Sequence, residues 1–308
     1  MGKHDLDVGW IDLVWAAITV GKPGIAHLFS HGWHSISDVI VRSHTVYANL
    51  RTHGALFRRS SLYNAQDPSE KSGTSYFLGM MAAKLIAERL LDTPWLMHVS
   101  MFTSSGGTVR LHGNSEPDLI GIRRNGDWIV MEAKGRSGRF SSVAMAKAKT
   151  QTRQLRKING QFPILRVGVQ AHFSPNLCFS IEDPEEYEED ARDFSGDLEL
   201  ATRRYYSSIL LATTSSSETR NIAGREFQTR HLEEIGVTVG IERKIREILS
   251  GDNAVELQLR QILEDSKETL GAEEEGTSVF GDGVLIELDG RWSDENMQRN
   301  PTLRNRIT

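Results

Sequence analysis

The sequence is short of several features that would mark particular classes of protein. It has one cysteine, Cys178, in 308 residues, which excludes an intrachain disulfide and fits a reducing compartment. Its formal net charge of −5 argues against a surface that is basic all over, although a local basic groove remains compatible with it. Gly-rich nucleotide-binding loops and internal repeats are also missing, so we expect no ATP or dinucleotide site.

Long hydrophobic runs are missing as well. The most apolar stretch, residues 10–20, contains Asp12 and is followed by Gly21-Lys22-Pro23, so it is too short and too interrupted to span a membrane. Asp5 and Asp7 precede it, which is not the pattern of a cleavable signal peptide. We therefore expect a cytoplasmic protein with no membrane partner.

The most informative stretch that is present contains two apolar runs joined by Asn125-Gly126. An Asn-Gly pair between runs rich in Ile, Val and Leu is a strong signal for a β-hairpin. Asp118 begins the first run, and Glu132 and Lys134 end the second. Paired carboxylates beside a lysine are suited to holding a hard divalent cation next to a phosphate.

The length of the hairpin loop decides whether these side chains meet. A two-residue loop would place Asp118 opposite Ala133 and turn Glu132 to the other face of the sheet. A three-residue loop with Gly126 in a left-handed conformation places Asp118 opposite Glu132, with Lys134 on the same face. We predict the three-residue loop. Two opposed carboxylates destabilise a sheet unless something neutralises them, and a metal ion would do so.

The periodicity of apolar residues predicts the elements around the hairpin. We expect a helix at 74–91, a strand at 95–101, a second helix from 141 or 142 to about 158, and strands at 164–171 and 177–181. This order indicates an α/β or α+β core with a central mixed sheet flanked by helices. The composition, with 39% hydrophobic and 25% charged residues, is that of an ordinary globular protein.

The remaining sequence predicts four parts for the chain. They are a helical N-terminal extension at 1–73, the mixed core at 74–182, an acidic segment and helical region at 183–276, and a small hairpin with a C-terminal tail at 277–308. Helices are expected at 197–250 and 253–267, and breaker residues around Asp67-Pro68 suggest the first boundary. The acidic run at 182–199 is either a solvated surface segment or an electrostatic gate that mimics nucleic acid.

Pro117-Asp118, followed after fourteen positions by Glu132-Ala133-Lys134, resembles the signature of the PD-(D/E)XK nuclease superfamily. The order of elements over residues 74–181 is similar to the restriction-endonuclease-like core of that superfamily. The resemblance implies metal-dependent endonucleolytic cleavage of phosphodiester bonds in nucleic acid, DNA rather than RNA, as in restriction enzymes and phage-defence effectors. Some members of the superfamily have lost activity, so a nuclease-fold protein acting as a nucleic-acid-binding or assembly subunit is the alternative.

Ordinary chemistry assigns roles within this signature. Asp118, Glu132 and the carbonyl of Ala133 would hold Mg²⁺ or Mn²⁺ by oxygen ligands. Lys134 would orient the attacking water or stabilise the charge that develops on the phosphorus oxygens. A fourth oxygen ligand could come from Glu88, because members often carry an acid on the helix before the hairpin. Glu88 falls on the apolar side of that helix.

Two residues of the second helix are further candidates. Gln151 lies within the apolar face that Ala148 and Leu155 help to define, and a polar group there needs a partner such as the site. Some branches of the superfamily carry a Gln on this helix followed four residues later by Tyr. Leu155 occupies that position here, so the chain departs from those branches. We predict Gln151 as a catalytic residue and Lys147, at the border of the face, as a nucleic-acid contact.

Basic and histidine side chains flank the proposed site on both sides. Arg136 and Arg139 follow the catalytic strand, where they would meet a phosphate backbone or simply lie in a solvated turn. His112 precedes the hairpin and could touch a phosphate or a base. The helical extensions are candidates for binding a partner protein or forming a homo-oligomer.

Overall fold

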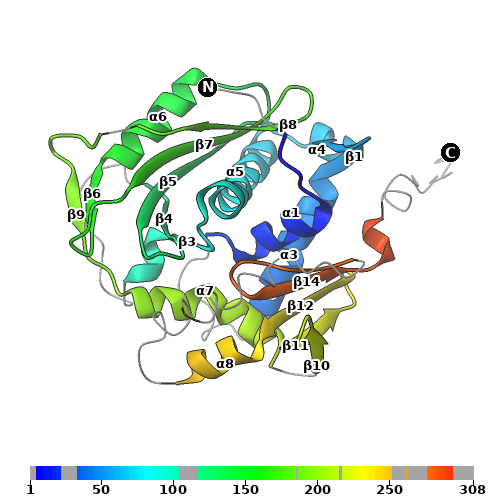
Figure 1. The fold of residues 1–308 in the computed structure, drawn as a ribbon. Helices are drawn as coiled ribbons and strands as arrows, with labels where there is room; N and C mark the ends of the chain where they lie inside the picture. The colour runs from blue at the N-terminus through cyan, green and yellow to red at the C-terminus, as the bar shows by residue number, and fades with distance from the viewer. Residues whose placement is uncertain are drawn as a thin grey trace, which may run out of the picture.

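The structure, a computed structural model, describes residues 5–21, 33–103, 117–184, 186–214, 217–251, 261 and 276–293, with the backbone alone at 33–35. Over these residues the chain is a mixed α and β protein with two five-stranded sheets. Helices lie between the sheets and on the outer face of the first one (Figure 1). The expected mixed α/β class is confirmed.

The first sheet contains the predicted hairpin. Its strands, in spatial order, are β3 (Trp95–His98), β4 (Leu119–Ile122), β5 (Trp128–Gly135), β7 (Leu165–Phe173) and β8 (Leu177–Glu182). Only β5 and β7 run parallel among these neighbours, and the other pairs are antiparallel. A parallel pair needs a crossover connection, which helix α6 (Ser142–Arg153) provides.

Helix α5 (Pro68–Leu91) covers one face of this sheet and begins earlier than we expected. Asp67 caps it, with its side chain accepting from the backbone N–H groups of Ser69 and Glu70, while Glu70 completes a capping box. Proline is tolerated in the first turn, where its missing N–H has no partner to lose. The residues interpreted as a breaker therefore start the helix, and the boundary placed at residue 73 falls inside α5.

Helix α5 approaches β5 very closely at two glycines. A Cβ atom on Gly79 would lie 2.7 Å from the backbone carbon of Lys134, and one on Gly135 would lie 1.6 Å from the backbone oxygen of Ser75. Side chains at these positions would separate helix and strand. The glycines therefore set the position of α5 at the end of β5 that carries Lys134.

Helix α6 covers the opposite face and is shorter than expected. Met145 and Ala148 pack at Gly168 of β7, which lies beside Glu132 in the parallel ladder. The helix ends at Arg153. Leu155 and Ile158, which we assigned to its apolar face, instead belong to strand β6 (Leu155–Ile158), which pairs in parallel with β9 (Arg192–Phe194).

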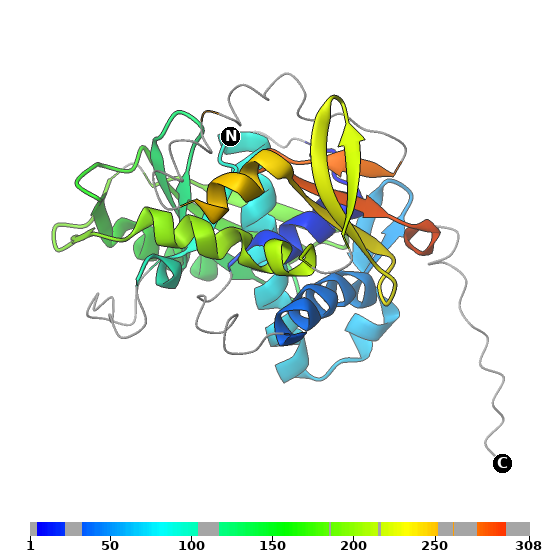
Figure 2. The ribbon, with the colours of Figure 1, turned by 90° about the horizontal axis from the view of Figure 1, so that it is seen from below.

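The second sheet corrects the prediction for residues 197–250. Helices α7 (Leu198–Ala212) and α8 (Arg243–Ser250) are present, but the residues between them form β10 (Glu218–Ile222), β11 (Arg225–Leu232) and β12 (Val237–Glu242). The expected C-terminal hairpin is present as β13 (Thr277–Val279) and β14 (Val284–Leu288). It joins the same antiparallel sheet, in the order β10-β11-β12-β14-β13. Figure 2 shows the β10–β11 hairpin projecting from the body of the molecule.

The N-terminal region is helical in part. Its elements are α1 (Trp10–Thr19), α3 (Trp33–Asn49), the hairpin of β1 (Leu50–His53) and β2 (Leu56–Arg59), and α4 (Ser61–Ala65). Helix α1 lies between α5 and the second sheet (Figure 1). One apolar cluster joins residues from α1, α5, α7 and both sheets. No helix in the described residues is long and apolar enough to cross a membrane.

Some expectations fall on residues outside the described part of the chain. They are the nucleic-acid contact at His112 and, apart from residue 261, the helix at 253–267.

Candidate active site

The hairpin has the register that brings the two acids together. Strands β4 and β5 pair from Leu119 opposite Met131 to Ile122 opposite Trp128. Gly126 has a φ of +92°, as the predicted three-residue loop requires. One residue outside the pair of Leu119 and Met131, Asp118 and Glu132 therefore face each other. The backbone N–H of Asp118 donates to Oε2 of Glu132 at 2.8 Å.

Glu132 is the most buried member of the group, with 1% of its surface exposed. Burial raises the pKa of Glu132 to about 7, and the charge of Asp118 adds to the rise. Lys134 and the hydrogen bond from the Asp118 backbone oppose this rise in the pKa of Glu132. The protonated form of Glu132 is thus favoured below about pH 7, and a further positive charge beside it would favour the ionised form.

Lys134 connects the acids to helix α6. Its ammonium group is ion-paired with Oε1 of Glu132 and donates to Oε1 of Gln151 at 2.7 Å. The Gln151 side chain is buried on α6, whereas the Lys134 side chain is 22% exposed. The structure therefore brings Asp118, Glu132, Lys134 and Gln151 together, with the lysine at the opening to solvent.

Gln170 positions this end of the sheet and was missed by the sequence analysis. It is fully buried in β7, opposite Lys134 in the parallel ladder. Its amide accepts from the backbone N–H of Ser141 at 2.7 Å and donates to the carbonyl of Ser141 at 2.9 Å. A polar residue between the apolar Val169 and Ala171 of a buried strand was the signal that could have identified it.

Two further side chains approach Asp118 and were also missed. Tyr76 belongs to α5, and burial together with the charges of Asp118 and Glu132 raises the pKa of its hydroxyl. His98 ends β3, and its Nδ1 accepts from the backbone N–H of Ser100 at 3.2 Å. Burial lowers the pKa of His98, and Asp118 partly offsets that shift. Neither residue is part of a recognisable sequence motif. The packing of α5 places Tyr76 near the site, and the pairing of β3 with β4 places His98 there.

Glu88, predicted as a metal ligand, lies elsewhere. It is nine residues after Gly79, the residue of α5 that contacts β5 at Lys134, and nine residues of helix correspond to about 13 Å. Its Oε1 lies 3.7 Å from Nη2 of Arg124. A Cβ atom on Gly281 would lie 1.9 Å from the same Oε1, so the Glu88 carboxylate packs against the backbone of Gly281. Burial raises the pKa of Glu88, an effect that Lys84 opposes. The structure thus removes Glu88 from the Asp118 and Glu132 pair.

The remaining predicted residues lie on α6, in β5 and in the turn that follows β5. Lys147 is exposed on α6, one turn before Gln151. Arg136 and Arg139 are exposed in the turn after β5. Ala133 is buried, and its side chain belongs to the apolar cluster that α5 covers.

The acidic segment pairs with the outer cations of α6 and β6. Glu182, Glu188 and Asp193 form ion pairs with Lys149, Arg153 and Arg156, respectively. Lys149 and Arg153 belong to α6, and Arg156 belongs to β6. The segment therefore neutralises two cations of α6, while Lys147 has no ion-pair partner among the described residues.

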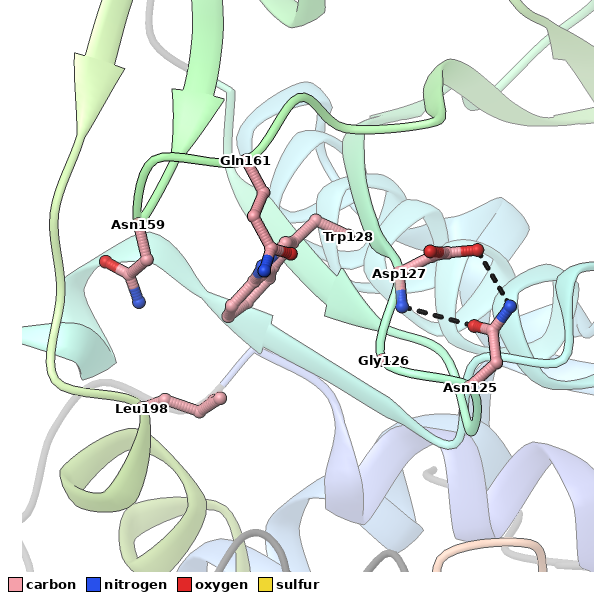
Figure 3. Close-up of a pocket in the computed structure, with 7 residues that line it drawn as sticks. All are labelled: Asn125, Gly126, Asp127, Trp128, Asn159, Gln161 and Leu198. Carbon is pink, nitrogen blue, oxygen red and sulfur yellow. Dashed lines mark hydrogen bonds between the residues drawn. The ribbon is translucent and has the colours of Figure 1, made fainter.

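The cavity in Figure 3 lies at the opposite end of the hairpin, by its loop. It has a volume of about 460 Å³ and is lined by Asn125, Gly126, Asp127, Trp128, Asn159, Gln161 and Leu198. Asn125 hydrogen-bonds to Asp127, and Asn159 bonds both backbone groups of Gly196. These side-chain amides thus stabilise local turns. None of the predicted site residues lines the cavity.

The donor set suits only certain metals. Within the described residues, no three His, Cys, Asp or Glu side chains are grouped closely enough to hold a metal ion. Mg²⁺ keeps several waters and is often held by one or two carboxylates, so the pair of Asp118 and Glu132 fits Mg²⁺ or Mn²⁺ rather than zinc.

No known protein family, curated protein or solved structure matches this chain.

Proposed function

We propose that this protein is a metal-dependent nuclease that hydrolyses phosphodiester bonds in nucleic acid. The observation that supports this most is the placement of Asp118 opposite Glu132, with Lys134 between Glu132 and Gln151. DNA is the proposed substrate, on the resemblance to the PD-(D/E)XK superfamily. The order of elements from α5 to β8, with α5 and α6 on opposite faces of the sheet, fits the core that this resemblance implies.

Each residue of the site has a separate role in this proposal. Asp118 and Glu132 would hold Mg²⁺ or Mn²⁺, which supplies polarisation of the phosphate and a more acidic bound water. Lys134 places a positive charge at the opening, where it would stabilise the charge that develops on the phosphate oxygens. Gln151 holds the lysine ammonium in position, and Gln170 holds the turn beside it.

A cleavage assay with a matched pair of lysine variants tests the proposal. Lys134→Ala removes the site lysine, and Lys244→Ala removes an exposed lysine on α8. With plasmid DNA and Mg²⁺ or Mn²⁺, we expect cutting by the wild type and by Lys244→Ala, and none in EDTA. Loss of one preorganised charge should slow Lys134→Ala by about 10²-fold or more. Equal cutting by both variants would sink the proposal.

The alternative is a non-catalytic nucleic-acid-binding or assembly subunit with the same fold. It is favoured by the absence of a third acidic, histidine or cysteine ligand beside Asp118 and Glu132 among the described residues. Calorimetric titration with Mn²⁺ separates the two functions. Absence of Mn²⁺ binding together with absence of cutting would support the binding protein, whereas Mn²⁺ binding that is lost in Asp118→Asn supports the nuclease.

A further inference from the structure

Two half-exposed aromatic rings flank the end of β5 that carries Lys134. Tyr76 is 52% exposed and Phe140 is 42% exposed. Tyr76 belongs to α5, on one face of the sheet, and Phe140 immediately precedes α6, on the other face. Burying apolar surface lowers the free energy. Both rings could therefore gain stability by stacking with a ligand that covers their exposed surface.

Tyr76 is held at the site by the close approach of helix and strand. The residue before it, Ser75, has its backbone oxygen against Gly135, and the backbone nitrogen of Tyr76 lies 3.0 Å from the position of a Cβ on Gly135. The Tyr76 hydroxyl feels the charges of both Asp118 and Glu132. The contact with Gly135 therefore places Tyr76 at the end of β5 that carries Lys134.

Phe140 is fixed on the other side by Gln170. The Gln170 amide binds both backbone groups of Ser141, the residue after Phe140, and Gln170 lies opposite Lys134 in the ladder. The Phe140 ring packs edge-on against His172 of the same strand, with 5.7 Å between ring centroids. The ring is thus anchored by its edge while much of its surface stays open.

The charges around these rings suit a polyanion. Arg136, Arg139 and Lys147 are exposed near the opening, and none has an ion-pair partner among the described residues. The outer cations of α6 are neutralised by the acidic segment. On α6 and in the turn before it, the cations without an ion-pair partner among the described residues are therefore Lys147, Arg136 and Arg139.

We propose that the site takes a single-stranded or locally unpaired nucleic acid, with unpaired bases stacking on Tyr76 and Phe140 on either side of the scissile phosphate. This inference rests on the proposed function and specifies its substrate. Base faces are covered by their neighbours in a duplex, whereas unpaired bases can stack on aromatic side chains irrespective of sequence. The cations would bind the backbone without reading it.

Binding measurements on single-stranded and duplex DNA test this inference. Fluorescein-labelled oligo(dT) and a duplex of the same length would be titrated in EDTA, at fixed salt, with fluorescence anisotropy as the readout. We expect Tyr76→Ala and Phe140→Ala each to weaken binding of the single strand about tenfold and to leave duplex binding unchanged. Tyr76→Phe, which keeps the ring, should bind as the wild type does.

Phe162→Ala is the matched control, because Phe162 is also 52% exposed but precedes β7 at the far end of the sheet. It should leave both affinities unchanged. Unchanged single-strand binding by Tyr76→Ala and Phe140→Ala, or an equal loss on duplex DNA or in Phe162→Ala, would overturn the inference. The metal-dependent cutting of plasmid by the wild type decides the proposed function separately, so the two failures are distinguishable.

Discussion

At the scale of single residues, the energetics of the site depend on Glu132. Its carboxylate is almost wholly buried and faces Asp118, and both circumstances raise its pKa, to about 7. The ion pair with Lys134 offsets part of this rise in the pKa of Glu132. The raised pKa means that Glu132 is protonated below about pH 7 in the metal-free protein, and that a bound cation would favour the ionised form.

This pKa shift predicts how stability depends on pH in EDTA. The pKa of Glu132 rises from its ordinary value of 4.5 to about 7 on folding, so its contribution to stability is fully present below pH 4.5 and is lost as pH rises through 7. The shift corresponds to a loss of about 3 kcal/mol of unfolding free energy. Urea unfolding at pH 5 and pH 8 measures it.

Glu132→Gln is the control, because it removes the ionisation and keeps the shape. The variant should lose this part of the pH dependence and be more stable than the wild type at pH 8 in EDTA. Addition of Mn²⁺ at pH 8 should stabilise the wild type and not the variant. A wild-type protein whose pH dependence equals that of Glu132→Gln would contradict the raised pKa.

At the scale of elements, the contact between α5 and β5 sets the geometry of the site. Gly135→Ala would drive a methyl group into the backbone of Ser75. We expect it to lower the unfolding free energy by about 1–3 kcal/mol, as overpacking does, and to reduce cleavage by moving Lys134 relative to Glu132. Gly138→Ala is the matched control in the same turn, since a Cβ there meets nothing within 4 Å. Similar cleavage and stability for the two variants would contradict this account.

The hairpin and its acids can be predicted from the sequence because the determining signal is local. Asn125-Gly126 marks the turn, and alternation along the strands then fixes which side chains face each other. The position of Glu88 could not be predicted in the same way. Helical periodicity gives the face on which a residue lies, whereas the distance along the axis depends on where α5 touches β5, which Gly79 sets.

Strands β10 to β12 of the second sheet were missed because the first turn among them lacks the usual residues. Ile222 pairs with Arg225, so Ala223 and Gly224 form a two-residue turn, with φ values of +49° and +78°. Such turns favour Asn-Gly, since alanine is strained at positive φ. The β-branched alternation of residues 237–241 was the remaining signal for a strand.

At the scale of the whole molecule, a buried polar network joins the two sheets. Lys84 of α5 and Asp282 of the β13–β14 turn are both fully buried, with 3.8 Å between the ammonium nitrogen and Oδ2. Tyr205 of α7 accepts from Lys84 at 2.7 Å and donates to Asp282 at 2.5 Å. The indole of Trp15 in α1 donates to Asp282 at 3.1 Å and lies 4.3 Å from the Lys84 ammonium.

This network predicts that the two sheets unfold together. Burial lowers the pKa of Lys84, and Asp282 opposes that shift, so the pair depends on both partners. Asp282→Asn would remove the nearest counter-charge of a buried ammonium, which costs about 3–5 kcal/mol. The measurement is urea unfolding, followed by tryptophan fluorescence and by far-ultraviolet circular dichroism. In the wild type the two signals should change in a single transition.

Two comparisons make the prediction specific. Asp193→Asn removes the acid of the surface ion pair with Arg156 and should change the unfolding free energy little, because solvent screens exposed ion pairs. The double variant Lys84→Met with Asp282→Asn should recover much of the loss, since the unpaired charge is gone. If Asp282→Asn were no more harmful than Asp193→Asn, or if the wild type unfolded in two separate transitions, the network would not be what couples the second sheet to the sheet that carries Asp118 and Glu132.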